Sequence, residues 1–166
     1  HTLSLLFTVY TETALKDLFL AMETDEDTRI YLNAQEIENK REGWYTDHSI
    51  QKIRLNELVE GENKLQVDIP YNSQVNIEAM FLLGDFSVKV LGRKQILGKP
   101  VKEVGYGDMT RQGCPFYGGN ITYRIPFTSI GGNISVQSTF FRAPVIKVVV
   151  DNVIKGYIAF SPYTVQ

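Results

Sequence analysis

Residues 105–120, which read GYGDMTRQGCPFYGGN, gather the side chains best suited to bind a polar, ring-shaped ligand. A sugar offers apolar C–H faces that stack on aromatic rings, and hydroxyl groups that need precisely placed donors and acceptors. Glycines allow the backbone to approach such a ligand closely. The candidate ligand-binding residues are therefore the aromatic and polar side chains of this stretch, with the single tryptophan: Tyr106, Asp108, Arg111, Phe116, Tyr117, Asn120 and Trp44.

The aromatic candidates also have structural interpretations. Trp44 lies beside an expected strand, and this position favours a core residue over a binding platform. Phe116 and Tyr117 follow Pro115 and could pin a long loop onto the rest of the fold. We therefore interpret residues 113–120 first as a connection packed across a β-sandwich and second as part of a ligand site.

Catalytic chemistry finds weaker support in the residues. Glycosidases need two carboxyl groups about 5 to 10 Å apart across a cleft. Nothing in the sequence places any two of the candidate carboxyl groups opposite each other. These carboxyl groups are Glu78, Asp85, Glu103 and Asp108. Nucleophilic catalysis by Cys114 is not supported, because no general base lies near it in the sequence. We expect Cys114 to act instead as a small hydrophobic residue that is buried or half-buried. We expect the chain itself to be non-catalytic.

Composition excludes several other classes of function. The net charge of −2 argues against a nucleic-acid partner, and no apolar run approaches the ~18 residues of a membrane span. No cofactor is expected, because zinc spacing and phosphate-loop spacing are both missing. The acidic run 23–27 could recruit structural calcium, but it lacks the spaced ligands of a dedicated loop, so a solvated turn is favoured. The lone cysteine leaves the compartment open.

Alternating apolar and polar residues indicate strands with one buried and one wet face. This pattern runs through residues 63–69, 85–90, 120–127 and 133–140, with turn sequences between them. No segment sustains a helical stripe over ten residues, although residues 55–61 could form one helical turn. The sequence therefore predicts an all-β fold, a β-sandwich of the jelly-roll type.

Two segments share one layout. Residues 25–51 and 142–166 each contain an apolar strand, a turn bearing Asn33 or Asn152, and then an aromatic strand. The chain is accordingly a single module over 1–166, or two related halves of about 1–92 and 93–166. The first copy continues into a closing strand, whereas the second stops at Gln166 before one. Either the sequence ends inside its fold, or an edge is left for another chain to pair with. Without an initial methionine, the sequence is expected to be a fragment of a larger multidomain protein.

A family resemblance rests on residues 31–69, YLNAQEIENKREGWYTDHSIQKIRLNELVEGENKLQVDI. This stretch resembles the galactose-binding-like (sugar-binding) jelly-roll modules attached to large bacterial glycoside hydrolases, of the family 2 and rhamnosidase-like kind. The matching features are the turn at Asn33, the aromatic pair Trp44 and Tyr45 before Asp47, and the Gly61–Asn63 turn. The family usually has Asn-Gly in the first turn, whereas this chain has Asn33-Ala34.

The resemblance implies a non-catalytic module, because the catalytic apparatus of such enzymes lies on a separate barrel domain. The expected function is to bind a glycan or to brace the catalytic domain of the parent enzyme, so the expected partners are that glycan or that domain. The alternative is a protein-interaction or scaffolding domain with no sugar site, and a free-standing glycosidase is less favoured.

Overall fold

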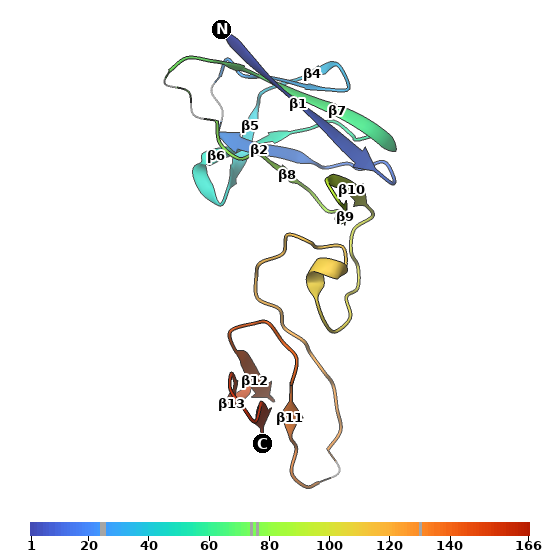
Figure 1. Ribbon diagram of the computed structural model, residues 1–166, viewed down its shortest axis with the longest axis vertical. Coiled ribbons are helices and arrows are strands. Elements are labelled where there is room, and N and C mark those ends of the chain that lie inside the picture. Colours follow the sequence, from blue (N-terminus) through green and yellow to red (C-terminus); the bar gives the residue numbers. More distant parts are fainter. Residues whose placement is uncertain (24–25, 74, 76, 130) are drawn as a thin grey trace. The chain divides into compact units, whose positions relative to one another are not determined.

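The computed structural model describes residues 1–23, 26–73, 75, 77–129 and 131–166, and within them the fold is all-β apart from one turn of 3₁₀ helix. The all-β prediction is confirmed. The chain divides into two compact units, His1–Gly118 and Gly119–Gln166 (Figure 1). The boundary between these units lies after residue 118; the sequence left open a single module or two related halves divided near residue 92.

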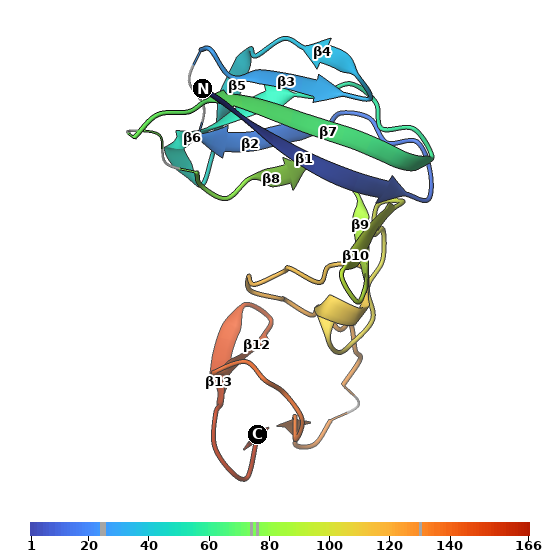
Figure 2. The ribbon, with the colours of Figure 1, turned by 45° about the horizontal axis from the view of Figure 1, so that its top comes forward.

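The first unit contains two sheets (Figure 2). The larger sheet has the order β4-β3-β7-β1-β10-β9, and its strands are β1 (Thr2–Thr11), β3 (Arg29–Leu32), β4 (Gln35–Ile37), β7 (Gly61–Pro70), β9 (Ser87–Leu91) and β10 (Lys94–Gly98). The smaller sheet has the order β5-β6-β2-β8, and its strands are β2 (Phe19–Glu23), β5 (Arg41–Tyr45), β6 (Asp47–Arg54) and β8 (Phe81–Leu83). Neighbouring strands are antiparallel except for β1 and β10, which run parallel over a short stretch.

One hydrophobic core joins the two sheets of this unit, as in a β-sandwich. Ile30 and Val67 reach it from the larger sheet, and Leu20, Met22 and Ile53 reach it from the smaller one. All five side chains are almost completely buried. Since each sheet buries only one face, the alternation seen in the sequence is the direct consequence of this layering.

β7 is the strand that the sequence predicted best. It pairs with β1 over its whole length and with β3 over four residues. Leu65, Val67 and Ile69 are buried, as the alternation in residues 63–69 predicted. Asn63 shares their face and is completely buried, although it is polar.

The amide of Asn63 joins three parts of the first unit. Its Oδ1 accepts hydrogen bonds from the Val59 backbone N–H (2.9 Å) and from Nδ2 of Asn33 (2.9 Å). Its own Nδ2 donates to the Val59 carbonyl (2.8 Å), which also accepts from Thr11 Oγ1 (2.6 Å). The Asn63 amide therefore ties the turn before β7 to the β3–β4 hairpin, and the end of β1 is joined to them through the shared Val59 carbonyl.

The second unit is small and contains two pairs of short strands. β12 (Ile146–Val150) pairs with β13 (Val153–Ile158), and β11 (Val136–Gln137) pairs with β14 (Thr164–Val165), both antiparallel. Among its described residues, only two hydrophobic side chains are buried, Val148 and Ile158. The second unit thus has little hydrophobic core of its own.

Two predicted strands of the second unit are wrong or largely wrong. Residues 120–127 form no strand, and the side chains expected to face inward are exposed. Residues 133–140 form a strand only at β11, and Phe140 is 88% exposed. The alternation is present in both segments, but a strand needs a paired neighbour and a covering layer, and the described residues of this unit supply neither along most of their length.

The helical turn that the sequence allowed at residues 55–61 does not form. Leu58 instead forms an isolated antiparallel bridge with Leu15, through Leu15 N to Leu58 O (2.9 Å) and Leu58 N to Leu15 O (3.0 Å). Both leucines are buried in the core. Burial of Leu58 next to Leu15 overrides the weak local tendency to form a turn of helix.

Because Asn63 is buried with three hydrogen bonds, its replacement should destabilise the first unit. We expect Asn63→Ala to lower the free energy of unfolding by about 2–3 kcal/mol, since polar groups of Val59 and Asn33 would lose their partner. Urea denaturation followed by fluorescence measures this change. Asn56→Ala, at an exposed position, is the matched control and should change stability by less than about 0.5 kcal/mol; equal effects of the two substitutions would contradict the prediction.

Candidate functional site

The loop after β10 is closed by the side chain of Gln112. Its Oε1 accepts from the Gly105 backbone N–H (2.7 Å), and its Nε2 donates to the Gly105 carbonyl (3.2 Å). This two-point clamp joins residues seven positions apart in the sequence. The segment between them, which contains Tyr106, Asp108 and Arg111, is therefore held in a defined shape.

Asp108 caps the 3₁₀ turn η1 (Met109–Arg111) within this loop. Its Oδ1 accepts from the backbone N–H (2.9 Å) and the hydroxyl (2.6 Å) of Thr110. Its other oxygen, Oδ2, lies 3.7 Å from Nε of Arg111, and both side chains are exposed. A carboxylate and a guanidinium are thus presented side by side to solvent, and most of the guanidinium donors remain accessible because the Arg111 side chain is 88% exposed.

Gly113 attaches the loop to the sandwich. Its carbonyl accepts from the Val88 backbone N–H on β9 (2.8 Å). Its φ of +87° lies in the left-handed region, and a Cβ at this position would come within 2.8 Å of Val101 Cγ2. Only glycine suits both constraints, so the structure explains why a glycine stands at position 113 of the glycine-rich stretch.

The aromatic residues of the loop are exposed. Tyr106 and Phe116 are each 69% exposed, and Tyr117 is about half exposed. The interpretation of residues 113–120 as a connection packed across the sandwich is therefore wrong for its aromatic side chains. Cys114 is partly buried, as expected.

Trp44 is not the core residue that its position favoured. It lies on β5 and is 48% exposed, with its ring centroid 4.3 Å from that of His48. The adjacent Tyr45 contacts Phe81 of β8, with ring centroids 5.4 Å apart. The reason for the error is a pair of register shifts between β5 and β6, which re-aim side chains in a way that simple alternation does not predict.

The smaller sheet carries an aromatic and basic outer face that was not predicted. Phe19 and Phe81 alternate with buried inward residues and so lie on the face away from the core. Lys52 and Arg54 lie over the Phe19 ring, at 4.8 and 4.6 Å from its centroid. Arg54 also binds Glu42 (3.0 Å), so this face is polar at its edge. The signal was available in the sequence, because Lys52 and Arg54 alternate with buried Ile53, but only the strand order places Phe19 beside them.

The predicted residues are thus brought together only in part. Tyr106, Asp108 and Arg111 share one clamped loop, and Phe116 and Tyr117 belong to the next turn, where the Tyr117 N–H donates to the Cys114 carbonyl (3.1 Å). Trp44 lies on a different element, β5. Asn120 is exposed and belongs to the second unit.

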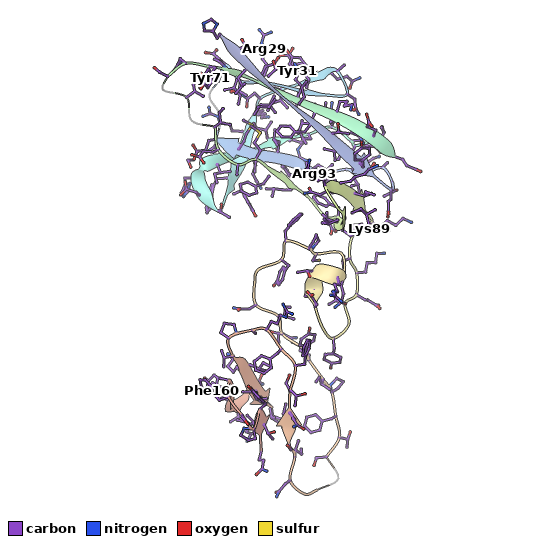
Figure 3. All side chains as sticks on the ribbon, viewed as in Figure 1. Arg29, Tyr31, Tyr71, Lys89, Arg93 and Phe160 are labelled. Atoms are coloured by element: carbon purple, nitrogen blue, oxygen red, sulfur yellow. The ribbon has the colours of Figure 1, made fainter. Side chains whose placement is uncertain are left out.

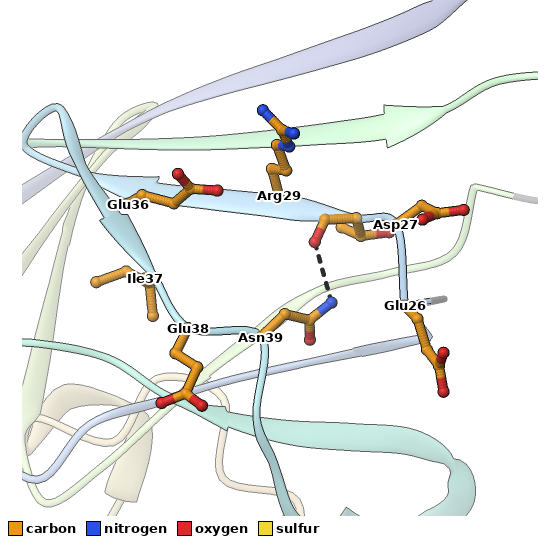
Figure 4. Close-up of a pocket in the computed structure, with 8 residues that line it drawn as sticks. Glu26, Asp27, Arg29, Glu36, Ile37, Glu38 and Asn39 are labelled. Atoms are coloured by element: carbon orange, nitrogen blue, oxygen red, sulfur yellow. Dashed lines mark hydrogen bonds between the residues drawn. The ribbon is translucent and has the colours of Figure 1, made fainter.

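A polar hollow of about 460 Å³ lies beside the β3–β4 hairpin (Figure 4). Half of its lining is acidic, and the lining residues are Glu26, Asp27, Thr28, Arg29, Glu36, Ile37, Glu38 and Asn39. Figure 4 shows Arg29 and Glu36 pointing to one side and Glu26 and Glu38 to the other. The pKa of Arg29 is raised, first by a hydrogen bond with Tyr31 and then by the charges of Tyr31 and Glu36. Arg29 and Tyr31 both lie on β3 (Figure 3).

The other carboxyl groups considered for catalysis lie among different neighbours. Asp85 lines a second hollow together with Asp17 and Glu57, but Glu57 pairs with Lys16 and Asp17 with Arg54, each at 3.5 Å. Within the described parts of the chain, no group of three or more acidic, histidine or cysteine side chains could hold a metal ion. The calcium position considered at residues 23–27 falls partly outside the described residues. No helix in the described parts is long and apolar enough to cross a membrane.

Comparison with known proteins identifies no relative: no family model, no curated protein and no solved structure matches this chain. Its function must therefore be inferred from the fold and from the side chains that the fold presents.

The start of β6 gives a test of local electrostatics next to Trp44 and Tyr45. The backbone N–H and the hydroxyl of Ser49 both bind Asp47 Oδ1 at 2.8 Å, and these two hydrogen bonds lower the pKa of Asp47. We expect Ser49→Ala to raise the pKa of Asp47 part of the way to its ordinary value, because the backbone hydrogen bond remains. Carboxyl-detected NMR titration measures the shift.

The sign of the effect on stability follows from linkage. A carboxyl group whose pKa is lowered in the folded state stabilises the fold above its unfolded pKa, and this contribution is lost as the pH falls through the folded pKa. Any difference in stability between Ser49→Ala and the unchanged protein that arises from Asp47 should therefore be present near neutral pH and vanish in acid. Ser73→Ala, at an exposed position, should leave the titration of Asp47 unchanged; an unshifted Asp47 in Ser49→Ala would contradict the assignment.

Proposed function

We propose that this chain is a non-catalytic, carbohydrate-binding β-sandwich module of a bacterial glycoside hydrolase, with its sugar site on the loop 105–117. The observation that carries the proposal is the exposed Tyr106 in the same clamped loop as the exposed Asp108–Arg111 pair. An aromatic face next to a paired acceptor and donor is the combination that a sugar ring requires. The two sheets with one shared core support the proposed jelly-roll, galactose-binding-like fold.

Preorganisation of the loop supports binding over a passive connection. The Gln112 clamp and the Thr110–Asp108 hydrogen bonds fix the backbone around Tyr106 before any ligand arrives. A site that is already ordered loses less conformational entropy when it binds. Loops carried on a rigid β scaffold are also where binding residues concentrate.

A second candidate function is protein interaction or bracing without a sugar site. The observation that favours it is the large number of exposed apolar side chains in the second unit, among them Phe140 and Phe160, which is 84% exposed (Figure 3). Contiguous exposed apolar surface is typical of surfaces that contact another protein. Under this hypothesis the partner is the catalytic domain of the parent enzyme.

The two functions are separated by titrating ¹⁵N-labelled protein with mono- and oligosaccharides, galactose and rhamnose among them. The proposal predicts saturable NMR shifts that cluster on residues 105–117. Tyr106→Ala and Arg111→Ala should each weaken binding by about tenfold, since each removes either the stacking face or the charged donor.

Tyr71→Ala is the control, because Tyr71 is also an exposed tyrosine but lies just after β7, outside the loop. It should leave the affinity within twofold. If no residue shifts at millimolar sugar, the sugar site is refuted and the interaction function takes its place. Shifts that cluster on Phe19, Trp44 and Phe81 would move the site to the outer face of the smaller sheet.

A further inference from the structure

Two hairpins, one in each unit, have the same local geometry. In the first unit Leu32 pairs with Gln35 across the two-residue turn Asn33–Ala34, whose φ values are 51° and 65°. In the second unit Val150 pairs with Val153 across Asp151–Asn152, whose φ values are 48° and 65°. Two consecutive left-handed residues between paired strands define a type I′ turn, so the entering strands β3 and β12 can be aligned residue by residue. The returning strands differ, because the pairing of β12 with β13 shifts register between Val148 and Val149 and leaves one extra residue in β13.

The alignment also matches the character of the strands that enter the turns. Residues Arg29, Ile30, Tyr31 and Leu32 of β3 align with Lys147, Val148, Val149 and Val150 of β12. Ile30 and Val148 are both buried, and Arg29 and Lys147 are both basic and exposed. At these two positions the strands therefore have the same pattern, with an apolar side chain facing inward and a basic side chain facing outward.

In the first unit, β7 covers the outer edge of β3. Leu32 pairs with Leu65 and Arg29 with Asp68. Asn33 fixes this register at the turn: its backbone N–H donates to the Lys64 carbonyl (2.8 Å), and its Oδ1 accepts from the Lys64 N–H (2.9 Å). One antiparallel strand thus satisfies both the edge of β3 and the side chain at the first turn position.

The corresponding edge of β12 has no strand beside it in the described part of the chain. In an antiparallel hairpin with a two-residue turn, the backbone groups of alternate residues point away from the partner strand. Because Val150 flanks the turn, the outward groups on β12 belong to Val149 and Lys147. Val149 is also 45% exposed, so both backbone and apolar surface are accessible on this edge.

We propose that the outer edge of β12 is the docking site for an antiparallel strand of a partner polypeptide with the pattern of β7. The partner strand would place apolar residues opposite Val148 and Val150 and an acidic residue opposite Lys147, as Asp68 lies opposite Arg29. The Asp151 carboxylate, which takes the place of the Asn33 side chain, would accept a backbone N–H at the start of that strand. This inference does not depend on a sugar site, and it specifies the kind of partner that the interaction function leaves open.

The test uses a synthetic peptide with the sequence of residues 61–70, GENKLQVDIP, and the full-length ¹⁵N-labelled protein. The proposal predicts saturable shifts on β12 and slower amide hydrogen exchange at Lys147 and Val149 when peptide is added. A peptide with Asp68→Lys would place like charges opposite each other at Lys147, so it should bind about threefold more weakly.

Two proline variants form a matched pair, because Val149 and Ile154 lie opposite each other in the hairpin. Each substitution removes one N–H that points away from the hairpin, but from opposite edges. Val149→Pro should weaken peptide binding by about tenfold, and Ile154→Pro should leave it within twofold. Protection of the Val148 and Val150 amides shows whether each variant keeps the hairpin.

Three results would overturn the proposal. The first is the lack of protection at Lys147 and Val149 both with free peptide and with the same peptide tethered after Gln166, where its effective concentration reaches the millimolar range. The second is equal loss of binding in two folded proline variants. The third is protection of these amides without peptide in a protein that sediments as a dimer, which would make a second copy the occupant.

Discussion

The first unit depends on a polar side chain inside its apolar core. Asn63 stands where the pattern of β7 would place a fourth apolar residue, and its amide instead binds both the backbone of Val59 and the side chain of Asn33. A buried amide is tolerated only when its partners are satisfied, so the partners must lie at fixed positions. This requirement fixes the register between β7 and the β3–β4 hairpin, and with it the strand order of the larger sheet.

The same constraint explains why parts of the fold could be predicted from the sequence. The alternation in residues 63–69 has a buried face because β7 lies between β3 and β1, with the smaller sheet over it. Residues 120–127 alternate just as regularly, yet Ile125 and Phe127 are exposed. Alternation states which residues share a face but not whether a second layer covers that face, and the latter depends on contacts far apart in the sequence.

In the candidate site, too, residues that are close in the sequence could be predicted to lie together, whereas residues joined only by the strand order could not. Tyr106, Asp108 and Arg111 lie within six residues, so one loop carries all three, and the turn capped by Asp108 brings its carboxylate beside Arg111. The outer face of the smaller sheet joins Phe19 to Lys52 and Arg54, which lie more than thirty positions further along the sequence. Trp44 shows a third case, because register shifts in β5 change the direction of a side chain whose strand was correctly expected.

The two hairpins show which part of the fold is determined by the residues of the turn alone. Asn33–Ala34 and Asp151–Asn152 both adopt left-handed turns. Asn33, Asp151 and Asn152 are of the non-glycine types that do so at least cost, whereas Ala34 is not. The hairpin itself therefore needs only its own residues and forms in both units. A two-stranded hairpin is marginally stable alone, however, and the first becomes part of a sandwich because β7 supplies paired backbone, apolar cover and Asn63 at once. The first unit has fourteen clustered core residues and the described part of the second has two buried hydrophobic residues, because the first unit adds further strands and a second sheet to its hairpin.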